Sequence, residues 1–372
     1  MRRRVNRDRL TAILMLSPSI VLVAVFVYGF IGSTAWTSLT DSNALQQLSK
    51  LPANFVGLRN FTELFTGILY QRFRIDLVNT VFFTILFIVV CLAVGILLAV
   101  LLDQKIKGES VFRTIFLFPM ALSFVVTGVI WKWLFNPNSG LNVLPTFIGL
   151  PAGNFNWFVN EQKWLQFNWQ NVPAYLGIVI MGIVIFFALR AWAKHRSGVA
   201  ALLAAVAILI LAWITFGNPQ QVAGLAAPEE HGFNVALLAV VLAAGWQMSG
   251  YTMAMYLAGL RGIPDELREA ARVDGANEFL VYRHVVFPLL APITLSAMII
   301  LGHISLKIFD LVYAMAGGDN LYVDMPGINM WFTTFRGGDF ARGAVIAIIM
   351  LIMVAVVIIP YLVVNLRGEK SL

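Results

Sequence analysis

The sequence has little cysteine and little charge, and both scarcities narrow the class of protein. Cys91 is the only cysteine among 372 residues, so the chain can form no internal disulfide and no thiol metal cluster. Charged residues make up 12% of the chain and hydrophobic residues 59%, whereas a soluble domain carries about 25% charged residues. This composition predicts a membrane protein.

The motifs of common catalytic and nucleotide sites are also absent from the sequence. It contains no G-x-x-x-x-G-K-[ST] phosphate loop, no G-x-S-x-G and no H-E-x-x-H. Its 4 histidines fall in different segments without the spacing of metal ligands. We therefore expect that this chain is not an enzyme and binds no cofactor or metal.

Long apolar segments are abundant, and each has about the 20 residues that a membrane-spanning helix needs. Because a helix satisfies its own backbone hydrogen bonds in lipid, we expect an all-α polytopic fold with about eight spans rather than a barrel. A cleaved signal peptide is the alternative for the first segment, but its apolar region is too long. The expected spans are 11–34, 77–101, 114–134, 173–189, 198–216, 234–258, 290–311 and 342–364.

The basic residues predict how these spans are oriented. With the N-terminus in the cytoplasm, 17 of the 26 lysines and arginines lie at the two termini and in segments 102–113, 190–197 and 259–289. Only 6 lie in the loops on the other side. This positive-inside bias predicts a multi-pass protein of a prokaryotic cell membrane with both termini in the cytoplasm. It also explains the net charge of +7 without a nucleic-acid partner.

Segment 259–289 has the pattern of a cytoplasmic docking loop. Pro264 suits the first turn of a short helix, and Gly275 can end that helix in the left-handed conformation. Asn277 can cap a second short helix. We expect Pro288, and a second proline four residues later, to separate this helix from the next span. On these residues alone, an ordinary amphipathic loop on the membrane surface is an equally good interpretation.

The same segment resembles the signature loop of permease subunits from binding-protein-dependent ABC importers. That signature, the EAA motif, reads E-A-A, three residues, G, nine residues, then I-x-L-P. The matching residues are Glu269-Ala270-Ala271, Gly275 and Val285-Val286-Phe287-Pro288, and Asp274 and Ala276 complete the form typical of the carbohydrate, maltose-permease-like branch. Later stretches also resemble that branch: Lys307-Ile308-Phe309-Asp310, Ala316-Gly317-Gly318 (followed by Asp319 where the branch has T-G-G-G-P) and Phe335-Arg336-Gly337-Gly338-Asp339-Phe340.

The resemblance implies a type I importer fold and a transmembrane permease subunit of an ATP-driven sugar importer that works by alternating access. In that family the loop is a coupling helix that docks on a separate ATPase subunit, which binds ATP and Mg²⁺. The implied partners are a second homologous permease, two ATPase subunits, an extracytoplasmic solute-binding protein and the sugar. The implied coupling residues are Glu269, Ala270, Ala271, Asp274, Gly275, Ala276 and Pro288.

Polar and aromatic residues inside the spans are candidates for the substrate pathway. In the sixth span they offer an aromatic face and hydrogen bonds that suit a sugar, although aromatic residues in bundles usually only pack. In the seventh span three polar residues are spaced i, i+4 and i+7, which places them on one helix face. A snorkelling charge or a simple ion pair is the competing interpretation of the two charged residues among them. These candidates are Trp246, Gln247 and Tyr251, and His303, Lys307 and Asp310.

We expect the chain to divide into four segments. Residues 1–76 hold the first helix and an outer loop, and 77–169 hold the second and third spans and an outer loop. Residues 170–233 are expected to be an inserted helical hairpin, because a pair of extra spans keeps the coupling loop on the cytoplasmic side. Residues 234–372 hold the remaining spans and the coupling loop.

Two other functions compete with the importer. An ion-coupled secondary transporter would show internal repeats with broken helices at matched positions, and the sequence has no such repeats. A membrane-embedded enzyme would need a cluster of acid, base or metal-binding residues. Neither alternative accounts for the loop motif.

Overall fold

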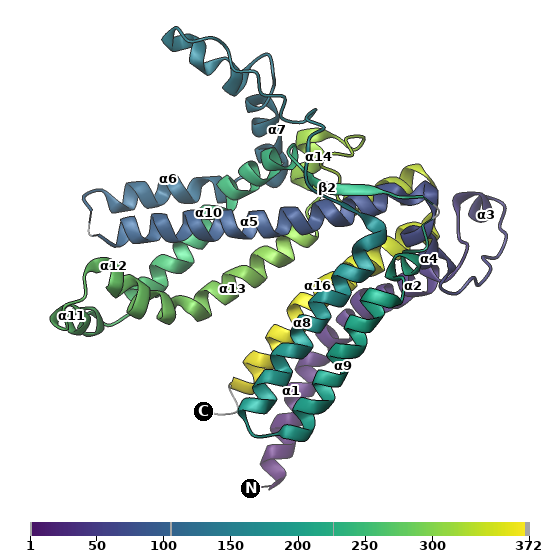
Figure 1. Cartoon of the computed structure of the whole chain (residues 1–372), viewed down its shortest axis with the longest axis horizontal. Coiled ribbons are helices and arrows are strands. Elements are labelled where there is room, and N and C mark those ends of the chain that lie inside the picture. The colour runs from purple at the N-terminus through teal and green to yellow at the C-terminus, as the bar shows by residue number, and fades with distance from the viewer. Residues whose placement is uncertain (1, 105, 226, 369–372) are drawn as a thin grey trace. The chain divides into compact units, whose positions relative to one another are not determined.

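The computed structural model describes residues 2–104, 106–225 and 227–368, and helices dominate it (Figure 1). The described residues contain one sheet, formed by two antiparallel strands, β1 (Lys163–Asn168) and β2 (Glu230–Asn234). The helices are α1 (Arg2–Val23), α2 (Phe30–Ser38), α3 (Ala44–Leu48), α4 (Arg59–Thr66), α5 (Gln71–Asp103), α6 (Glu109–Ala121), α7 (Phe124–Leu134), α8 (Val172–Ala193), α9 (Ser197–Phe216), α10 (Leu237–Arg261), α11 (Asp265–Val273), α12 (Glu278–Val281), α13 (Phe287–Leu306), α14 (Asp310–Ala316), α15 (Pro326–Trp331) and α16 (Phe340–Gly368).

Seven helical segments of the described chain are long and apolar enough to cross a membrane, and α6 with α7 would form an eighth. The prediction of an all-α polytopic fold is therefore confirmed. The third predicted span, 114–134, is not straight, because α6 and α7 are bent by 99° relative to each other. Pro119 lies near the end of α6. Ser123 then caps α7, since its hydroxyl accepts a hydrogen bond from the Val126 amide at 3.2 Å.

The chain forms two compact units, and the first consists of the chain up to Thr62 together with Asn329–Met353. In this unit Gly338 has a φ of +66° and its carbonyl accepts a hydrogen bond from the Ala44 amide at 2.7 Å. A Cβ on Gly338 would lie 2.8 Å from the Ala44 Cβ. The conformation and the close approach both require glycine. The structure therefore explains why the 335–340 motif has a glycine at position 338.

The second unit consists of Glu63–Ile328 and the chain from Val354, and α10 lies at its centre (Figure 1). The apolar window of α10 is 72% buried, whereas that of every other candidate span is 28% buried or less. α10 packs along α5 and against α6 and α13. At Gly250 the α6 backbone comes so close that a Cβ would lie 2.1 Å from the Phe116 carbonyl oxygen. Small residues such as Gly250 thus allow the neighbouring helices to approach the α10 backbone closely.

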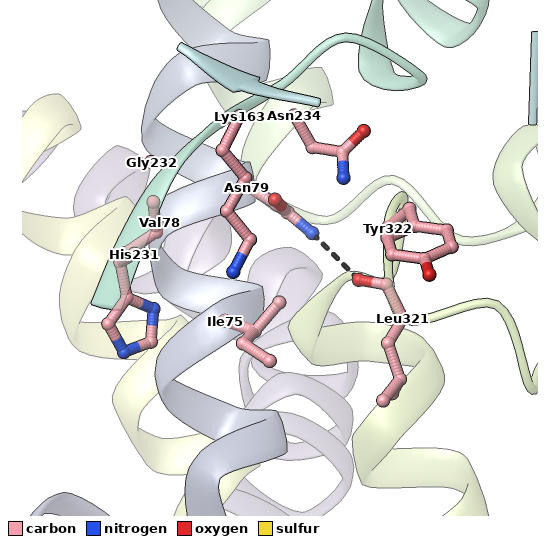
Figure 2. Close-up of a pocket in the computed structure, with 9 residues that line it drawn as sticks. All are labelled: Ile75, Val78, Asn79, Lys163, His231, Gly232, Asn234, Leu321 and Tyr322. Carbon is pink, nitrogen blue, oxygen red and sulfur yellow. Dashed lines mark hydrogen bonds between the residues drawn. The ribbon is translucent and has the colours of Figure 1, made fainter. Parts of the chain in front are cut away.

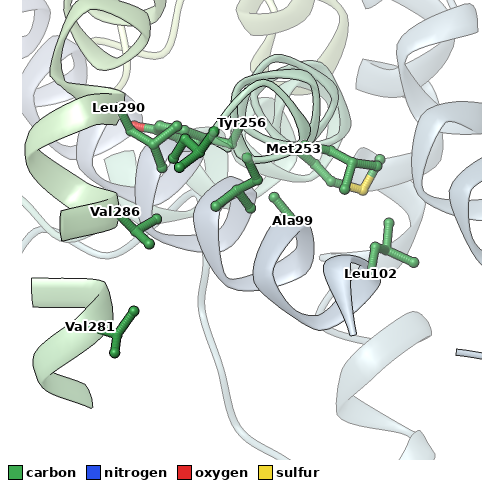
Figure 3. Packing of buried hydrophobic residues seen from close by; sticks show 10 residues of the cluster. Ala99, Leu102, Met253, Tyr256, Val281, Val286 and Leu290 are labelled. Atoms are coloured by element: carbon green, nitrogen blue, oxygen red, sulfur yellow. The ribbon is translucent and has the colours of Figure 1, made fainter. Parts of the chain in front are cut away.

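A cluster of buried apolar side chains joins the end of α5 and α10 to the segment around α11 and α12 (Figure 3). Leu102, Leu260 and Val286 are all 1% exposed or less in this cluster. Ala271 and Ala276, which flank the turn after α11, pack against its edge. The loop between α10 and α13 is therefore attached to the bundle by apolar contacts at its turn.

The loop continues into the next span without the break that the prolines predicted. α12, a π-helical turn Tyr282–Val286 and α13 follow one another directly, and Glu278–Leu306 forms a single candidate span. The prediction that Pro288 separates the second short helix from the span is therefore wrong. A π turn widens the helix locally, and such turns accompany prolines and other interruptions of the hydrogen-bond ladder.

The helices α8 and α9 pack against each other as a hairpin, and the two strands bracket it (Figure 1). Lys163 pairs with Asn234, and Asn168 pairs with Glu230. The chain therefore leaves the bundle through β1 and returns through β2. The division into four segments, with an insertion at 170–233, stays a prediction.

Candidate coupling loop and translocation pathway

The α11 helix begins and ends as its sequence predicts, with a shift of one residue at its start. Pro264 is the N-cap rather than a residue of the first turn. At the other end Gly275 has a φ of +88°. Its amide donates to the Arg272 carbonyl, and the Ala276 amide donates to the Ala271 carbonyl, each at 3.0 Å. This pair of hydrogen bonds is the Schellman motif, which requires a left-handed residue at the position of Gly275.

The turn after α11 leads directly into α12. The Asn277 side chain accepts a hydrogen bond from the Leu280 amide at 3.0 Å, so the predicted cap is present. Across the turn, Arg272 Nε lies 2.7 Å from Glu278 Oε1, and the two side chains are 47% and 63% exposed. An exposed ion pair of this kind contributes little stability, so the turn depends mainly on its backbone hydrogen bonds.

Most of the predicted coupling residues lie on the surface of the loop. Glu269, Ala270, Asp274, Gly275 and Pro288 are exposed. The two remaining residues, Ala271 and Ala276, are half-buried against the apolar cluster described above.

The loop exposes apolar side chains beside these residues, and two of them, Val273 and Leu267, were not selected from the sequence. Val273 is 86% exposed, Phe279 67% and Leu267 45%. Such a patch, next to charged residues on a short helix, is a feature of interaction surfaces. Val273 directly precedes the turn at Asp274 and Gly275. An apolar residue at the end of a short polar helix was the sequence signal that could have predicted this exposed contact.

Two candidate pathway residues of the sixth span, Trp246 and Gln247, lie on α10 close to α7 and to the bend before it. The ring centroid of Trp246 is 5.8 Å from that of Trp131, at an interplanar angle of 65°. Gln247 is 2% exposed, and its Nε2 donates to the Leu122 carbonyl at 2.8 Å. That carbonyl lies at the bend between α6 and α7, so the glutamine also supports the bend. Tyr251, one turn further, is half-buried.

Unpaired polar atoms gather where α7 faces α10. Among the described residues, Thr127 Oγ1, Trp131 Nε1 and Gln247 Oε1 are buried without a hydrogen-bond partner. Buried polar groups are rarely left unpaired in folded proteins. Sequence reasoning did not select Thr127 or Trp131, although a hydroxyl and an indole one turn apart in an apolar helix were a usable signal.

The seventh-span candidates do not share one helix face. α13 ends at Leu306, Lys307 has non-helical backbone angles, and α14 begins at Asp310. The prediction of a continuous helix over 290–311 is therefore wrong at its end. Lys307 and Asp310 are exposed, whereas His303 is half-buried inside α13. The structure thus places His303 inside α13 and the two charged residues beyond the end of that helix.

Near the N-terminal end of α5, a cavity of about 130 Å³ opens beside the two-stranded sheet (Figure 2). Asn79, His231, Asn234 and Tyr322 are among its lining residues, and Asn79 Nδ2 donates to the Leu321 carbonyl at 3.4 Å. Its walls combine amide, imidazole, ammonium and phenol groups with apolar side chains. The cavity belongs to the rim of the bundle, away from the α11 end of α5.

A buried charge network lies next to this cavity. Arg74, 1% exposed, donates through Nε to Glu229 Oε2 at 2.8 Å and through Nη1 to the Leu64 and Gly67 carbonyls at 3.1 and 3.0 Å. His231 Nε2 lies 3.0 Å from the other Glu229 oxygen. Burial lowers the pKa of His231, and the Glu229 carboxylate opposes that change. The network fastens the returning strand β2 to α5.

Comparisons with known proteins identify the family of this chain. A family model described as "Binding-protein-dependent transport system inner membrane component" matches residues 198–368. A probable ABC transporter permease protein of Pyrococcus horikoshii is 33% identical over 361 residues, which are 96% of this chain and 96% of the relative. The chain belongs to this family of transport-system inner membrane components. It is a permease subunit of an ABC importer, a multi-pass membrane protein, and ATP hydrolysis takes place on a separate subunit.

Other relatives extend along nearly the whole permease. The xylose/arabinose import permease protein of Haloferax volcanii is 31% identical over 353 residues, 92% of this chain and 84% of the relative. The trehalose/maltose transport system permease protein of Thermococcus litoralis is 24% identical over 357 residues, 96% and 94% of the two chains. A solved bacterial ABC transporter for alginate import has a chain with a TM-score of 0.60 and 16% identity, over 95% of the permease and 96% of that chain. This likeness confirms the importer fold.

Proposed function

We propose that this permease is a subunit of a sugar importer and that its α11 loop couples the transport pathway to an ATPase. Two relatives are named for pentoses and for trehalose and maltose, and the solved transporter imports an acidic polysaccharide. Another relative, from Agrobacterium fabrum, is 25% identical and is named for glycerol 3-phosphate. The substrate class that these names have in common is a polyhydroxylated compound, and a sugar is the most frequent form.

The observation that carries the coupling role is the geometry of the α11 turn. The Schellman motif at Gly275 ends a nine-residue helix and leaves Glu269, Ala270 and Asp274 exposed on one short element. Ala271 and Ala276 lie beneath this surface, against the apolar cluster. A rigid short helix of this kind suits a partner's cleft, because it can transmit a rigid-body displacement. The exposed Val273 adds an apolar contact for the same partner.

The proposed substrate pathway follows the face where α7 and α10 meet. Trp246 and Tyr251 supply aromatic surface, and Gln247 and Trp131 supply the unpaired polar atoms. Sugars are bound by such combinations, because aromatic rings cover their apolar faces while hydrogen bonds fix their hydroxyls. His303, half-buried in α13, belongs to this proposal because its Nδ1 is buried without a hydrogen-bond partner. Lys307 and Asp310, which are exposed beyond the end of that helix, contribute charge at the pathway's mouth.

We place both termini and the α11 loop in the cytoplasm, as the basic residues predict. A second homologous permease would complete the pathway, two ATPase subunits would bind ATP and Mg²⁺, and an extracytoplasmic binding protein would deliver the sugar. In a solved structure, the alginate transporter is in complex with a periplasmic protein bound to an alginate pentasaccharide.

The proposal is tested with the purified complex in liposomes, with its binding protein and labelled pentoses and disaccharides. Uptake should require ATP and stop with vanadate. Gly275→Val should lower uptake per ATP hydrolysed, because a β-branched residue is strained at a φ of +88°. Gly149→Val is the matched control, since Gly149 also has a positive φ, +78°, and open space around a Cβ. ATP-independent uptake, or normal coupling in Gly275→Val, would contradict the proposal.

A further inference from the structure

Arg268 lies on α11, one residue before the EAA motif, and contacts two other helices. Its Nη1 donates to Oδ2 of Asp103, the last residue of α5, at 2.9 Å. Its Nη2 donates to the carbonyl of Leu260, near the end of α10, at 2.8 Å. The Arg268 and Asp103 side chains are only 14% and 10% exposed. One guanidinium group therefore joins three helices.

A second ion pair lies beside the first and fixes α10 to α6. Arg261, the last residue of α10, donates through Nη2 to Oε1 of Glu109, the first residue of α6, at 2.5 Å. These side chains are more exposed, at 45% and 29%. Because solvent weakens exposed ion pairs, the Arg268–Asp103 pair is the stronger connection of the two.

The body of α11 has few other attachments to the bundle. None of its nine residues is buried. An open cavity of about 620 Å³ lies between the start of α11, the end of α5 and the start of α6, and Asp103, Glu109, Arg261 and Arg268 all line it. Packing is therefore loose here, and the turn at the far end of α11 rests on the apolar cluster. The charged side chains span the gap that packing leaves open.

We propose that Arg268 and Asp103 form a clamp that transmits the displacement of α11 to α5, the longest helix of the second unit. This inference rests on the proposed coupling function of α11. A helix that was fastened only at its turn would pivot when its partner moved, and the ATPase stroke would be absorbed by the loop. With Arg268 bonded to Asp103 and to Leu260, both ends of α11 are fixed, so the stroke moves α5 and α10 together. Arg268 is a positioning residue in this scheme.

A purely structural role for the pair would affect assembly and thermal stability but not the ratio of uptake to ATP hydrolysis in complexes that assemble. The ratio is therefore the decisive measurement. Asp103→Asn keeps the side-chain shape and removes the charge. We expect this variant to assemble and hydrolyse ATP while uptake per ATP falls about fivefold or more, the scale of a typical coupling free energy. Arg268→Lys should retain an intermediate ratio, because lysine keeps the charge but cannot bond both partners.

A covalent bridge provides a test that does not depend on one variant folding well. Asp103→Cys/Arg268→Cys can be treated with a short bifunctional thiol reagent, because the sole native cysteine, Cys91, is 0% exposed. Uptake per ATP should be low before treatment and should rise when the bridge forms. Both measurements use the same protein preparation, so differences in folding cancel.

Glu278→Gln is the matched control, because it removes an ion pair of the same loop that does not reach α5. Its uptake ratio should match that of the parent. A parent-like ratio in Asp103→Asn, or no gain on bridging the double cysteine variant, would overturn the clamp. If the parent complex itself shows no ATP-dependent uptake, the proposed function fails instead, and the two failures are thereby distinguished.

Discussion

Gly95 of α5 lies directly against Thr252 of α10, and no side chain fits between them. A Cβ on Gly95 would be 2.1 Å from Thr252 Oγ1. That hydroxyl donates to the carbonyl of Cys91, one turn earlier on α5, at 2.6 Å. The two helices are therefore joined at their closest approach by a hydrogen bond that only a glycine allows.

Gly95→Val should disrupt this contact. Overpacking a close helix contact costs about 1–3 kcal/mol or more, so we expect a lower thermal transition of the purified permease in detergent. Gly182→Val is the control, because a Cβ there meets nothing within 4 Å. Equal stability of the two variants would show that α5 and α10 can separate without penalty.

Removing Arg74 should destabilise the permease strongly, because the buried Glu229 would keep its contact with His231 but lose its permanently charged partner. Breaking one partner of a buried ion pair costs about 3–5 kcal/mol. Arg74→Met should therefore reduce the thermal transition in detergent, and Arg74→Met/Glu229→Leu should recover part of it. A double variant that is less stable than Arg74→Met would contradict this account of the network.

The stability of the permease should decrease in mild acid because of His231. Burial lowers the pKa of this histidine in the folded state, whereas the pKa of a histidine in the unfolded chain is about 6.5. Protonation therefore favours the unfolded chain: the contribution of neutral His231 is complete above the unfolded pKa and falls as the pH drops through the folded pKa. Thermal transitions measured at several pH values should show a weaker acid dependence in His231→Gln. An identical pH profile in the two proteins would refute this assignment.

Substrate affinity should depend on Tyr251 and not on a tyrosine deeper in the same helix. Tyr251→Phe removes a hydroxyl proposed to bind substrate, and the loss of one such hydrogen bond, about 1 kcal/mol, should raise the KM for uptake about fivefold. Tyr256→Phe is the control, because Tyr256 is 2% exposed and its hydroxyl already bonds Thr294 Oγ1 at 3.0 Å. Equal KM values in both variants would remove Tyr251 from the pathway.

The proposed orientation can be tested with single introduced cysteines. Cys91 is 0% exposed, so the parent should not react with a membrane-impermeant maleimide. Phe147→Cys, at a position that is 80% exposed, should react in intact cells, and Val273→Cys, at an 86% exposed position, should react only in inside-out vesicles. Labelling of the second variant from outside the cell would place the α11 loop on the wrong side for an ATPase.

The α11 loop was predictable because its features are encoded within a few residues. Gly275 and Asn277 each act on backbone groups nearby in the chain, so the motif and the local structure agree. The spans were predictable for a similar reason, since hydropathy depends on composition alone. Neither kind of signal reveals geometry inside an apolar run, which is why the bend before Ser123 and the end of α13 at Leu306 were missed.

Interactions between distant segments could not be predicted from local patterns. Arg74 and Glu229 are separated by 155 positions, and they were expected in different segments, an outer loop for Arg74 and the inserted hairpin for Glu229. The pairing of β1 with β2 is equally non-local. Pro288 shows a third limit: rules for proline assume a regular α-helix, whereas the π turn before it lets the helix continue.

The antiparallel pairing of β1 and β2 brings together the start of α8 and the segment that follows α9. Gln220 Nε2 donates to Asn171 Oδ1 at 2.9 Å, so the chain returns to within a hydrogen bond of the place where it left. A segment whose ends already meet can be removed or exchanged at little entropic cost, because a short linker closes the gap. We therefore expect that a chain with the hairpin excised between Asn171 and Gln220 keeps Arg74, Glu229 and the sheet in place.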